Sequence, residues 1–410
     1  MKRFIAALLV LFSITGALGA QKLELYYYKQ ENQEGLKKLV DQFVKENPGI
    51  SIDLLIVPND ADATMSARAA QGKLPDILQM QSYSRVAEYA AKGYLVDLTK
   101  QPVLTKVVDS SKPAVTWNSK LWGLPMDFAG IGIIYNKDIF AKYGLKPPAT
   151  YRDLERLCRT LRTNGVTPFA GLLKENWSMG HFITLVHTNL LAEKNISADK
   201  FVADMNAGKT SYGVVDTDKL FSVMDFYRAN MDKNAEEWNW NEQQAAFAEG
   251  KAAMMVQGLW SYGAAIGTNP KLDCGFVPFP IYNDAGMNKF YADVDSCFGV
   301  SAQSAPDKKA AALKFLEWLA TSQAQKIWVE DYKLTLSFKG ADVSKLGGPF
   351  VDLMSGVGKN GAYPWAFASY PTAVFEDACK NGAQQYVFNK KTAEAVIADI
   401  DKQWAANVKK

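Results

Sequence analysis

The chain has 410 residues, with 46 Lys or Arg against 43 Asp or Glu and a net charge of +3. This length exceeds that of one ordinary domain, so the chain is expected to form two or three packed units. The near balance of charge, without a long basic run, argues against nucleic acid or an anionic membrane surface as a partner.

The first twenty residues have the layout of a secretory signal peptide. Lys2 and Arg3 precede an apolar run from Phe4 to Leu18, and small residues follow up to Ala20. No later stretch is long and apolar enough to span a bilayer. We expect cleavage near Ala20 and a periplasmic or other extracytoplasmic location, with an uncleaved membrane anchor as the alternative. No Cys follows the apolar run, so a lipid-anchored N-terminus is not expected.

After residue 20, strands and helices are expected to alternate. Apolar positions at helical spacing predict one helix, which Asn47-Pro48-Gly49 ends: Leu36, Leu39, Val40, Phe43 and Val44. The remaining patterns predict strands over 23–28, 50–57 and 74–78, and helices over 61–71 and 83–92. This alternation is typical of a mostly parallel α/β sheet.

The pattern changes in the rest of the chain. A strand over 121–125 runs into 131–135, helices dominate 138–231, and a β region covers 274–300. Helices return over 308–332, and an amphipathic helix ends the chain. No Pro/Ser-rich linker marks a single boundary. We therefore expect two α/β lobes with several crossings between them.

Few residues could support catalysis or bind a metal. His181 and His187 are six residues apart, which does not place them on one helical face, so we interpret them as half-buried polar residues. The GxGxxG segment 356–361 does not follow a predicted strand and cannot open a helix before Pro364, so it is expected to be a flexible loop. No catalytic residue, metal or cofactor is expected.

The four cysteines form no CxxC pair, which argues against a zinc or thioredoxin-like site. Buried thiols are the default expectation. If a disulfide forms, Cys274 and Cys297 are the favoured pair, because they lie in neighbouring predicted strands.

Aromatic and acidic side chains are the positive signal. Tyr26, Tyr27 and Tyr28 end the first strand, and seven tryptophans lie at or beside predicted loops or strand ends: Trp117, Trp122, Trp177, Trp238, Trp240, Trp260 and Trp365. Flat rings cover the C–H faces of sugars, while Asp, Glu, Asn and Gln bind the hydroxyls. Asp293 and Asp295 would share one side of a strand and could accept from such hydroxyls, or they could form a hydrogen-bonded bend.

Eight short segments carry a family resemblance when taken in order. They are GKLPDI (72–77), GYLVDLT (93–99), LWGLP (121–125), IYNKDIF (134–140), LKPPATY (145–151), FAEGKAAM leading to GLW (247–260), FVPFP (276–280) and 311–319. In this order the chain resembles the extracellular solute-binding proteins of ABC importers, in the carbohydrate-binding group that includes maltose- and raffinose-type proteins. Tyr151 replaces the usual Trp of the family's PPxTW segment.

The resemblance implies an α/β, two-lobe periplasmic-binding-protein fold with a three-segment hinge and a ligand cleft between the lobes. After a signal peptide over 1–20, the N-terminal lobe would comprise 21–127 and 293–335, and the C-terminal lobe 128–292 and 336–410. Crossings are expected near Asp127, Asp293 and Thr335.

The same resemblance implies a non-enzymatic monomer that captures a carbohydrate and delivers it to permease subunits of an ABC importer. In the Gly-x-Trp turn, Trp260 resembles the family's main stacking residue, and Trp177 a second aromatic. The other expected ligand-binding residues are Tyr28, Gln30, Glu31, Tyr83, Asp127, Asp295 and Trp365.

Two alternatives stay open from the residues. The same fold could bind a non-sugar solute such as a polyamine, because cationic ligands favour carboxylates beside aromatic rings. The other alternative is a secreted glycoside hydrolase. Such an enzyme would need two carboxyl groups across a cleft, and the chain has many carboxylates that could supply them.

Overall fold

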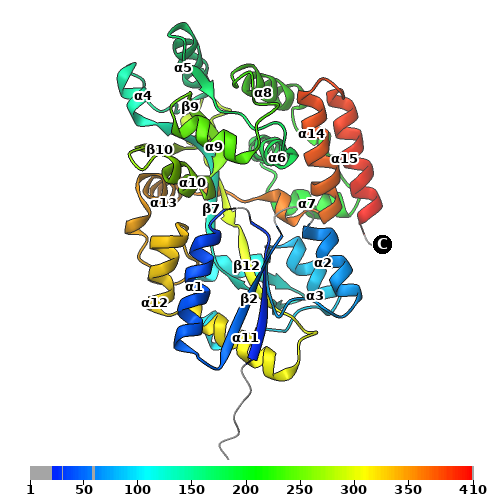
Figure 1. Cartoon of the computed structure of the whole chain (residues 1–410). Coiled ribbons are helices and arrows are strands. Elements are labelled where there is room, and N and C mark those ends of the chain that lie inside the picture. The colour runs from blue at the N-terminus through cyan, green and yellow to red at the C-terminus, as the bar shows by residue number, and fades with distance from the viewer. Residues whose placement is uncertain (1–20, 30, 58–60, 409–410) are drawn as a thin grey trace, which may run out of the picture.

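A computed structural model describes residues 21–29, 31–57 and 61–408. Two α/β lobes lie one above the other, and the helices α1, α2, α3 and α11 surround the lower one in Figure 1. The proposed signal peptide lies outside the described residues. Within the described part of the chain, no helix is long and apolar enough to cross a membrane.

The first lobe is organised around its first strand, β1 (Gln21–Tyr27). Leu23, Leu25 and Tyr27 pack on one face with the apolar stripe of α1 (Gln33–Glu46), while Tyr26 joins a separate cluster on the other face. Alternate residues of a strand point to opposite faces, so this strand is covered on both sides. The helices of this lobe are α1, α2 (Ala61–Ala70), α3 (Ser84–Ala91), α11 (Pro306–Leu319) and α12 (Ser322–Ile327).

The sheet of the first lobe contains both parallel and antiparallel strands. Its order is β2 (Ile50–Ile56), β1, β3 (Ile77–Gln81), β12 (Ser296–Val300) and β6 (Leu124–Pro125). The first three strands are parallel, as expected, and β12 runs antiparallel to β3 and β6.

The second lobe is built on the nine-residue strand β7 (Phe128–Asn136), which is almost wholly buried. Its sheet has the order β13 (Ala362–Tyr363), β11 (Phe290–Val294), β7, β9 (Ala252–Gly258) and β8 (Thr167–Phe169), and β10 (Cys274–Val277) also pairs with β7. The helices around it are α4 (Lys137–Lys142), α5 (Tyr151–Thr163), α6 (Asn176–Glu193), α7 (Ala198–Asn206), α8 (Thr217–Ala229), α9 (Trp240–Ala248), α10 (Trp260–Thr268), α13 (Gly348–Asn360), α14 (Lys380–Val387) and α15 (Ala393–Asn407).

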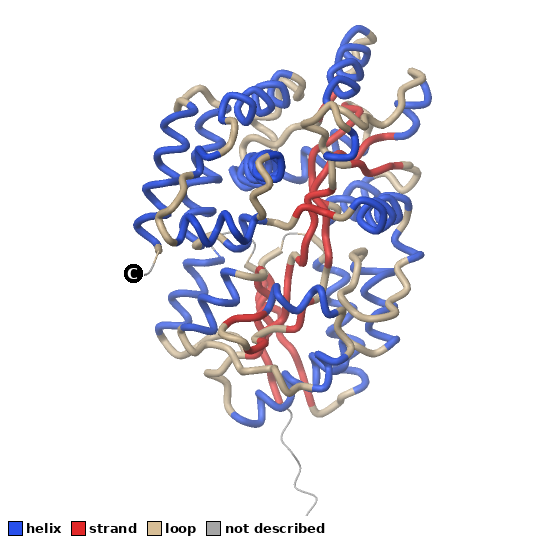
Figure 2. Tube along the Cα trace, turned by 180° about the vertical axis from the view of Figure 1, so that it is seen from behind, coloured by secondary structure: helices blue, strands red, loops and turns tan. Residues whose placement is uncertain are grey.

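The chain passes between the two sheets at short extended segments. One passage joins β6 to β7 and another joins β11 to β12, so that Asp293 still belongs to the second sheet while Ser296 opens a strand of the first. Near a third passage, the hydroxyl of Thr335 accepts a 3.1 Å hydrogen bond from the Phe128 amide. Figure 2 shows the strands running through the centre of both lobes.

The structure contradicts one expectation about local structure and settles another. The glycine-rich segment 356–361 forms the end of α13 rather than a flexible loop, and Gly361, at φ 72°, ends the helix. Cys274 and Cys297 lie in strands of different sheets, and all four cysteines are free and buried. The default expectation of buried thiols is therefore confirmed, and the favoured disulfide pair is separated because the chain changes lobe between the two residues.

Candidate functional site: an aromatic cleft between the lobes

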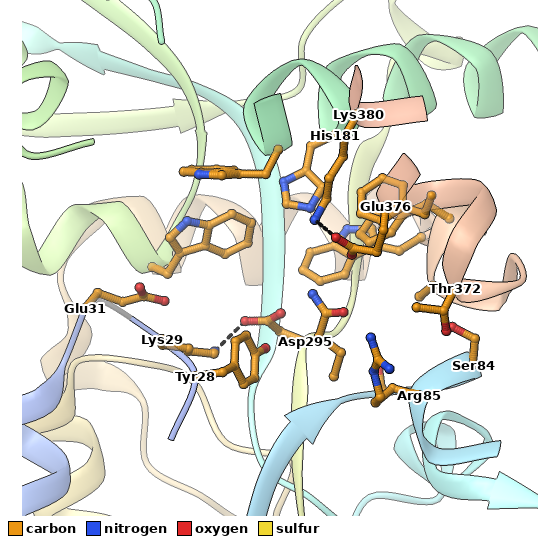
Figure 3. A pocket seen from close by; sticks show the side chains of 18 of the residues that line it. Tyr28, Lys29, Glu31, Ser84, Arg85, His181, Asp295, Thr372, Glu376 and Lys380 are labelled. Atoms are coloured by element: carbon orange, nitrogen blue, oxygen red, sulfur yellow. Dashed lines mark hydrogen bonds and ion pairs between the residues drawn. The ribbon is translucent and has the colours of Figure 1, made fainter. Parts of the chain in front are cut away.

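A cavity of about 220 Å³ lies between the lobes and is lined by side chains of both. Figure 3 shows Tyr28, Lys29 and Glu31 on one side of it and His181, Glu376 and Lys380 on the other. The lining residues are Tyr28, Lys29, Glu31, Gln81, Ser82, Ser84, Arg85, Trp177, His181, Trp240, Trp260, Asp295, Trp365, Phe367, Ala368, Thr372, Phe375, Glu376 and Lys380.

Aromatic rings from the second lobe form one wall of the cavity. The Trp260 ring contacts the Trp365 ring edge-on at 6.0 Å between centroids, and His181 lies 5.9 Å from Trp260. His181 also stacks on Phe375 at 5.6 Å. Burial lowers the pKa of His181 to about 3, so the imidazole is uncharged at neutral pH. The part of the wall that these rings form is therefore apolar and suited to covering a flat, uncharged face of a ligand.

Trp260 owes its position to the end of β9. The strand ends at Gly258, and Trp260 is the first residue of α10. A Cβ added at Gly258 would lie 2.1 Å from the Trp260 ring, so only glycine leaves space for the indole. The indole is 7% exposed and lines the cavity. Trp260 therefore takes part in core packing and also lines the cleft.

Polar side chains of the first lobe form the opposite wall. Tyr28, Lys29 and Glu31 follow β1, and Ser82, Ser84 and Arg85 follow β3. These two strands are parallel, so their carboxyl ends meet at the same edge of the sheet. Ligands of α/β proteins bind in crevices outside the carboxyl ends of strands, which makes this edge a suitable binding position.

A buried charge network lies at the base of the cleft. The Lys29 ammonium contacts Asp127 at 2.8 Å and Asp295 at 2.5 Å. Asp127 also accepts hydrogen bonds from the amide and hydroxyl of Ser296, at 2.7 and 2.8 Å. Burial by itself would lower the pKa of Lys29, but the two carboxylates outweigh it and raise the pKa well above its usual value. Lys29 therefore remains charged and links both segments that pass between the sheets.

The other two cations of the cavity lining are also paired. Arg85 contacts Glu88 at 3.0 Å, and Lys380 contacts Glu376 one helical turn away. The Glu31 carboxyl differs, because no hydrogen bond or ion pair joins it to another described residue, and it is partly exposed to the cavity. Burial raises the pKa of Glu31 to about 7, although the charge of Lys29 opposes this shift.

Six of the nine residues expected to bind ligand line this cavity: Tyr28, Glu31, Trp177, Trp260, Asp295 and Trp365. Tyr83 and Asp127 do not line it. The Tyr83 hydroxyl donates to Asp293, and Asp127 is fully buried beneath Lys29 and Ser296. Gln30 lies outside the described residues.

Sequence reasoning missed Lys29, Arg85, His181, Glu376 and Lys380, all of which line the cavity. The position of Lys29 between two predicted ligand-binding residues was an available signal. No pattern links η8 (Val374–Cys379), the π-helical turn that carries Glu376, to the first strand. Among the described residues, no cluster of three or more His, Cys, Asp or Glu could hold a metal ion.

The model of the family described as bacterial extracellular solute-binding protein matches residues 29–326, so the chain belongs to this family. A multiple sugar-binding protein of Streptococcus mutans is 26% identical over 326 residues, which are 79% of this chain and 76% of that protein. The maltodextrin-binding protein MdxE of Bacillus subtilis is 25% identical over 308 residues, or 73% and 69% of the two chains.

Solved structures share the two-lobe fold. RafE in complex with raffinose has a TM-score of 0.82 at 20% identity, with 95% of this chain and 100% of that chain covered. A chitin oligosaccharide binding protein also has a TM-score of 0.82, at 22% identity, with 94% and 99% covered. The expected fold, two α/β lobes of the solute-binding type, is confirmed.

Proposed function

We propose that this chain is the substrate-binding protein of an ABC-type sugar importer, and that it captures a mono- or oligosaccharide in the cleft. The observation that carries the proposal is the opposition of two walls. Trp260, Trp365 and Trp177 line one side, and hydrogen-bonding groups at the carboxyl ends of β1 and β3 line the other. A pyranose has apolar C–H faces and a rim of hydroxyls, so it matches this pair of walls. The sugars named for the relatives support the same ligand class.

The two lobes would close around the bound sugar. We assign 21–127 and 295–335 to one lobe and 128–294 and 336–410 to the other, so the boundary expected at Asp293 is moved to the passage between Val294 and Ser296. Ligand between two hinged lobes favours their closure. The proposed ligand-binding residues are Tyr28, Glu31, Trp177, Trp260, Asp295 and Trp365.

The proposed role is binding and delivery, without catalysis. Export through a cleaved signal peptide would place a monomeric protein outside the cytoplasmic membrane, where permease subunits of the importer would receive the sugar.

A thermal-shift screen tests the ligand class, because a ligand that binds only the folded state raises the melting temperature. Glucose, galactose, maltotriose, raffinose and N,N′-diacetylchitobiose should include at least one stabilising sugar. Titration calorimetry should then show saturable binding, and chromatography of the incubated sugar should show no hydrolysis products. Absence of any saccharide binding would contradict the proposal, and release of shorter sugars would favour a glycoside hydrolase.

A further inference from the structure

The cations that line the cleft are already neutralised by the protein. Among the described lining residues, Lys29 is bound by Asp127 and Asp295, Arg85 is paired with Glu88, and Lys380 with Glu376. A ligand carboxylate or sulfate that binds one of these cations would have to share it with the protein carboxylate already paired with it. In a partly desolvated cleft, the repulsion between two anions held this close makes such sharing unfavourable.

Glu31 is the exception among the charged lining residues. Figure 3 shows its carboxyl group pointing toward the cavity from the loop after β1, near Lys29 but without a bond to it. Lys29 itself turns toward Asp295, as the dashed line marks. A carboxylate accepts hydrogen bonds from hydroxyl or ammonium donors, and it repels another carboxylate at close range.

From this arrangement of paired cations and one unpaired carboxyl group we infer that the cleft selects uncharged or singly aminated saccharides, and that Glu31 is the residue that sets this selectivity. The inference rests on the proposed function and deepens it. A sugar hydroxyl or a single amine donates to Glu31. A uronic acid or sulfated sugar is repelled by Glu31, and no unpaired cation among the described lining residues compensates for this repulsion. A polyamine carries several positive charges and finds one unpaired carboxyl group, so the same argument disfavours it.

The inference is tested with matched sugars that differ in one substituent, which is a hydroxyl, an amine or a carboxylate. Melting curves at pH 8, where Glu31 is ionised, are recorded with glucose, glucosamine and glucuronate, and with galactose, galactosamine and galacturonate. Raffinose, maltotriose and N,N′-diacetylchitobiose serve as uncharged oligosaccharides, trigalacturonate as an anionic one, and spermidine as the polyamine. We expect stabilisation by an uncharged or singly aminated saccharide and none by uronates or spermidine at equal concentration.

The variant Glu31→Gln then assigns the selectivity to one residue. Its amide keeps the size of the side chain but removes the charge, so affinity for the best uncharged sugar should fall about tenfold, as expected when a hydrogen bond loses its charged acceptor. The matched control is Glu34→Gln, which alters an exposed glutamate in the first turn of α1. That variant should bind like the wild type, and both variants should melt within a few degrees of it.

Three outcomes overturn the inference in distinguishable ways. A uronate or spermidine that binds at least as tightly as every uncharged sugar refutes the charge selectivity. If Glu31→Gln binds every sugar as Glu34→Gln does, Glu31 does not set it. In the latter case saccharide binding, and with it the proposed function, still stands. Only a panel without any saccharide binding refutes both together.

Discussion

The phenol of Tyr83 donates a 2.9 Å hydrogen bond to the carboxylate of Asp293, which joins the N-terminal end of α3 in the first lobe to β11 in the second. The same carboxylate accepts from the Trp365 amide at 3.2 Å. Tyr83 adopts φ 56° and ψ −105°, a strained conformation for a residue with a side chain. Its amide is held by the Ala114 carbonyl at 2.7 Å. The strained tyrosine therefore connects the lobes and supports a tryptophan of the cleft wall.

Replacing Tyr83 with Phe should weaken lobe closure without disturbing either core. The variant loses one hydrogen bond to a charged acceptor, so affinity for the sugar identified by thermal shift should fall about tenfold. Small-angle scattering should show a larger radius of gyration at subsaturating sugar. Tyr94→Phe, in the same lobe with its ring against Tyr89, is the control. If Tyr83→Phe matches this control in affinity and in size, the bond has no part in closure.

Gly258→Ala should displace the Trp260 indole. The new methyl group would lie 2.1 Å from the ring, and the backbone at Gly258 does not need a positive φ, so the side chain is what must move. Affinity for the cognate sugar should fall about tenfold or more, as for other disturbed aromatic anchors, with about 1–3 kcal/mol of overpacking cost to stability. Calorimetry and melting curves measure the two effects separately.

Gly267→Ala provides the comparison for this prediction. Gly267 lies in the same helix as Trp260, and a Cβ added there would have no neighbour within 4 Å. This variant should retain wild-type affinity. Equal affinities in the two alanine variants would show that the position of the indole does not matter for binding.

The sequence predicts the elements of the first lobe closely because their signals are local. The apolar stripe of α1 and the alternation in β1 are set by residues within a few positions of one another. The family resemblance also identified three tryptophans of the cleft's aromatic wall, Trp177, Trp260 and Trp365. Pairings across the molecule are different, since Lys29 meets Asp127 and Asp295 over separations of 98 and 266 residues. No periodicity carries such information, so the ion pairs of Lys29 and the bond between Tyr83 and Asp293 could not be predicted from the sequence.

Lys29→Met should be strongly destabilising. The lysine and Asp127 side chains are 3% and 0% exposed, so removing the ammonium leaves two carboxylates facing each other in a desolvated site. Breaking a buried pair in this way costs about 3–5 kcal/mol. Urea unfolding should show a lower midpoint. The exposed pair Lys22–Asp53 provides the control, and Lys22→Met should leave the midpoint nearly unchanged. Equal midpoints for the two variants would contradict a structural role for the network.

The affinity for sugar should depend on pH through Glu31. Its pKa in the free protein is raised by burial to about 7. Sugar hydroxyls that donate to the carboxylate lower this pKa in the complex, so binding releases a proton and the affinity rises with pH up to about 7, then levels off. Between pH 5.5 and 8 we expect a gain of about tenfold, since one pKa unit corresponds to a factor of ten.

Two titratable groups near Glu31, Lys29 and His181, do not change charge between pH 5.5 and 8. Lys29 stays charged, because the carboxylates around it raise its pKa, and His181 stays neutral, with a pKa that burial lowers to about 3. Asp295, whose pKa burial also raises, could add a pH dependence of its own, as could Asp293, whose pKa burial raises as well. Calorimetric titrations of the wild type and Glu31→Gln across this range separate Glu31 from the other carboxyl groups. A flat profile in the variant assigns the proton to Glu31, whereas an unchanged slope would assign it to another group, such as Asp295 or Asp293, and refute the prediction.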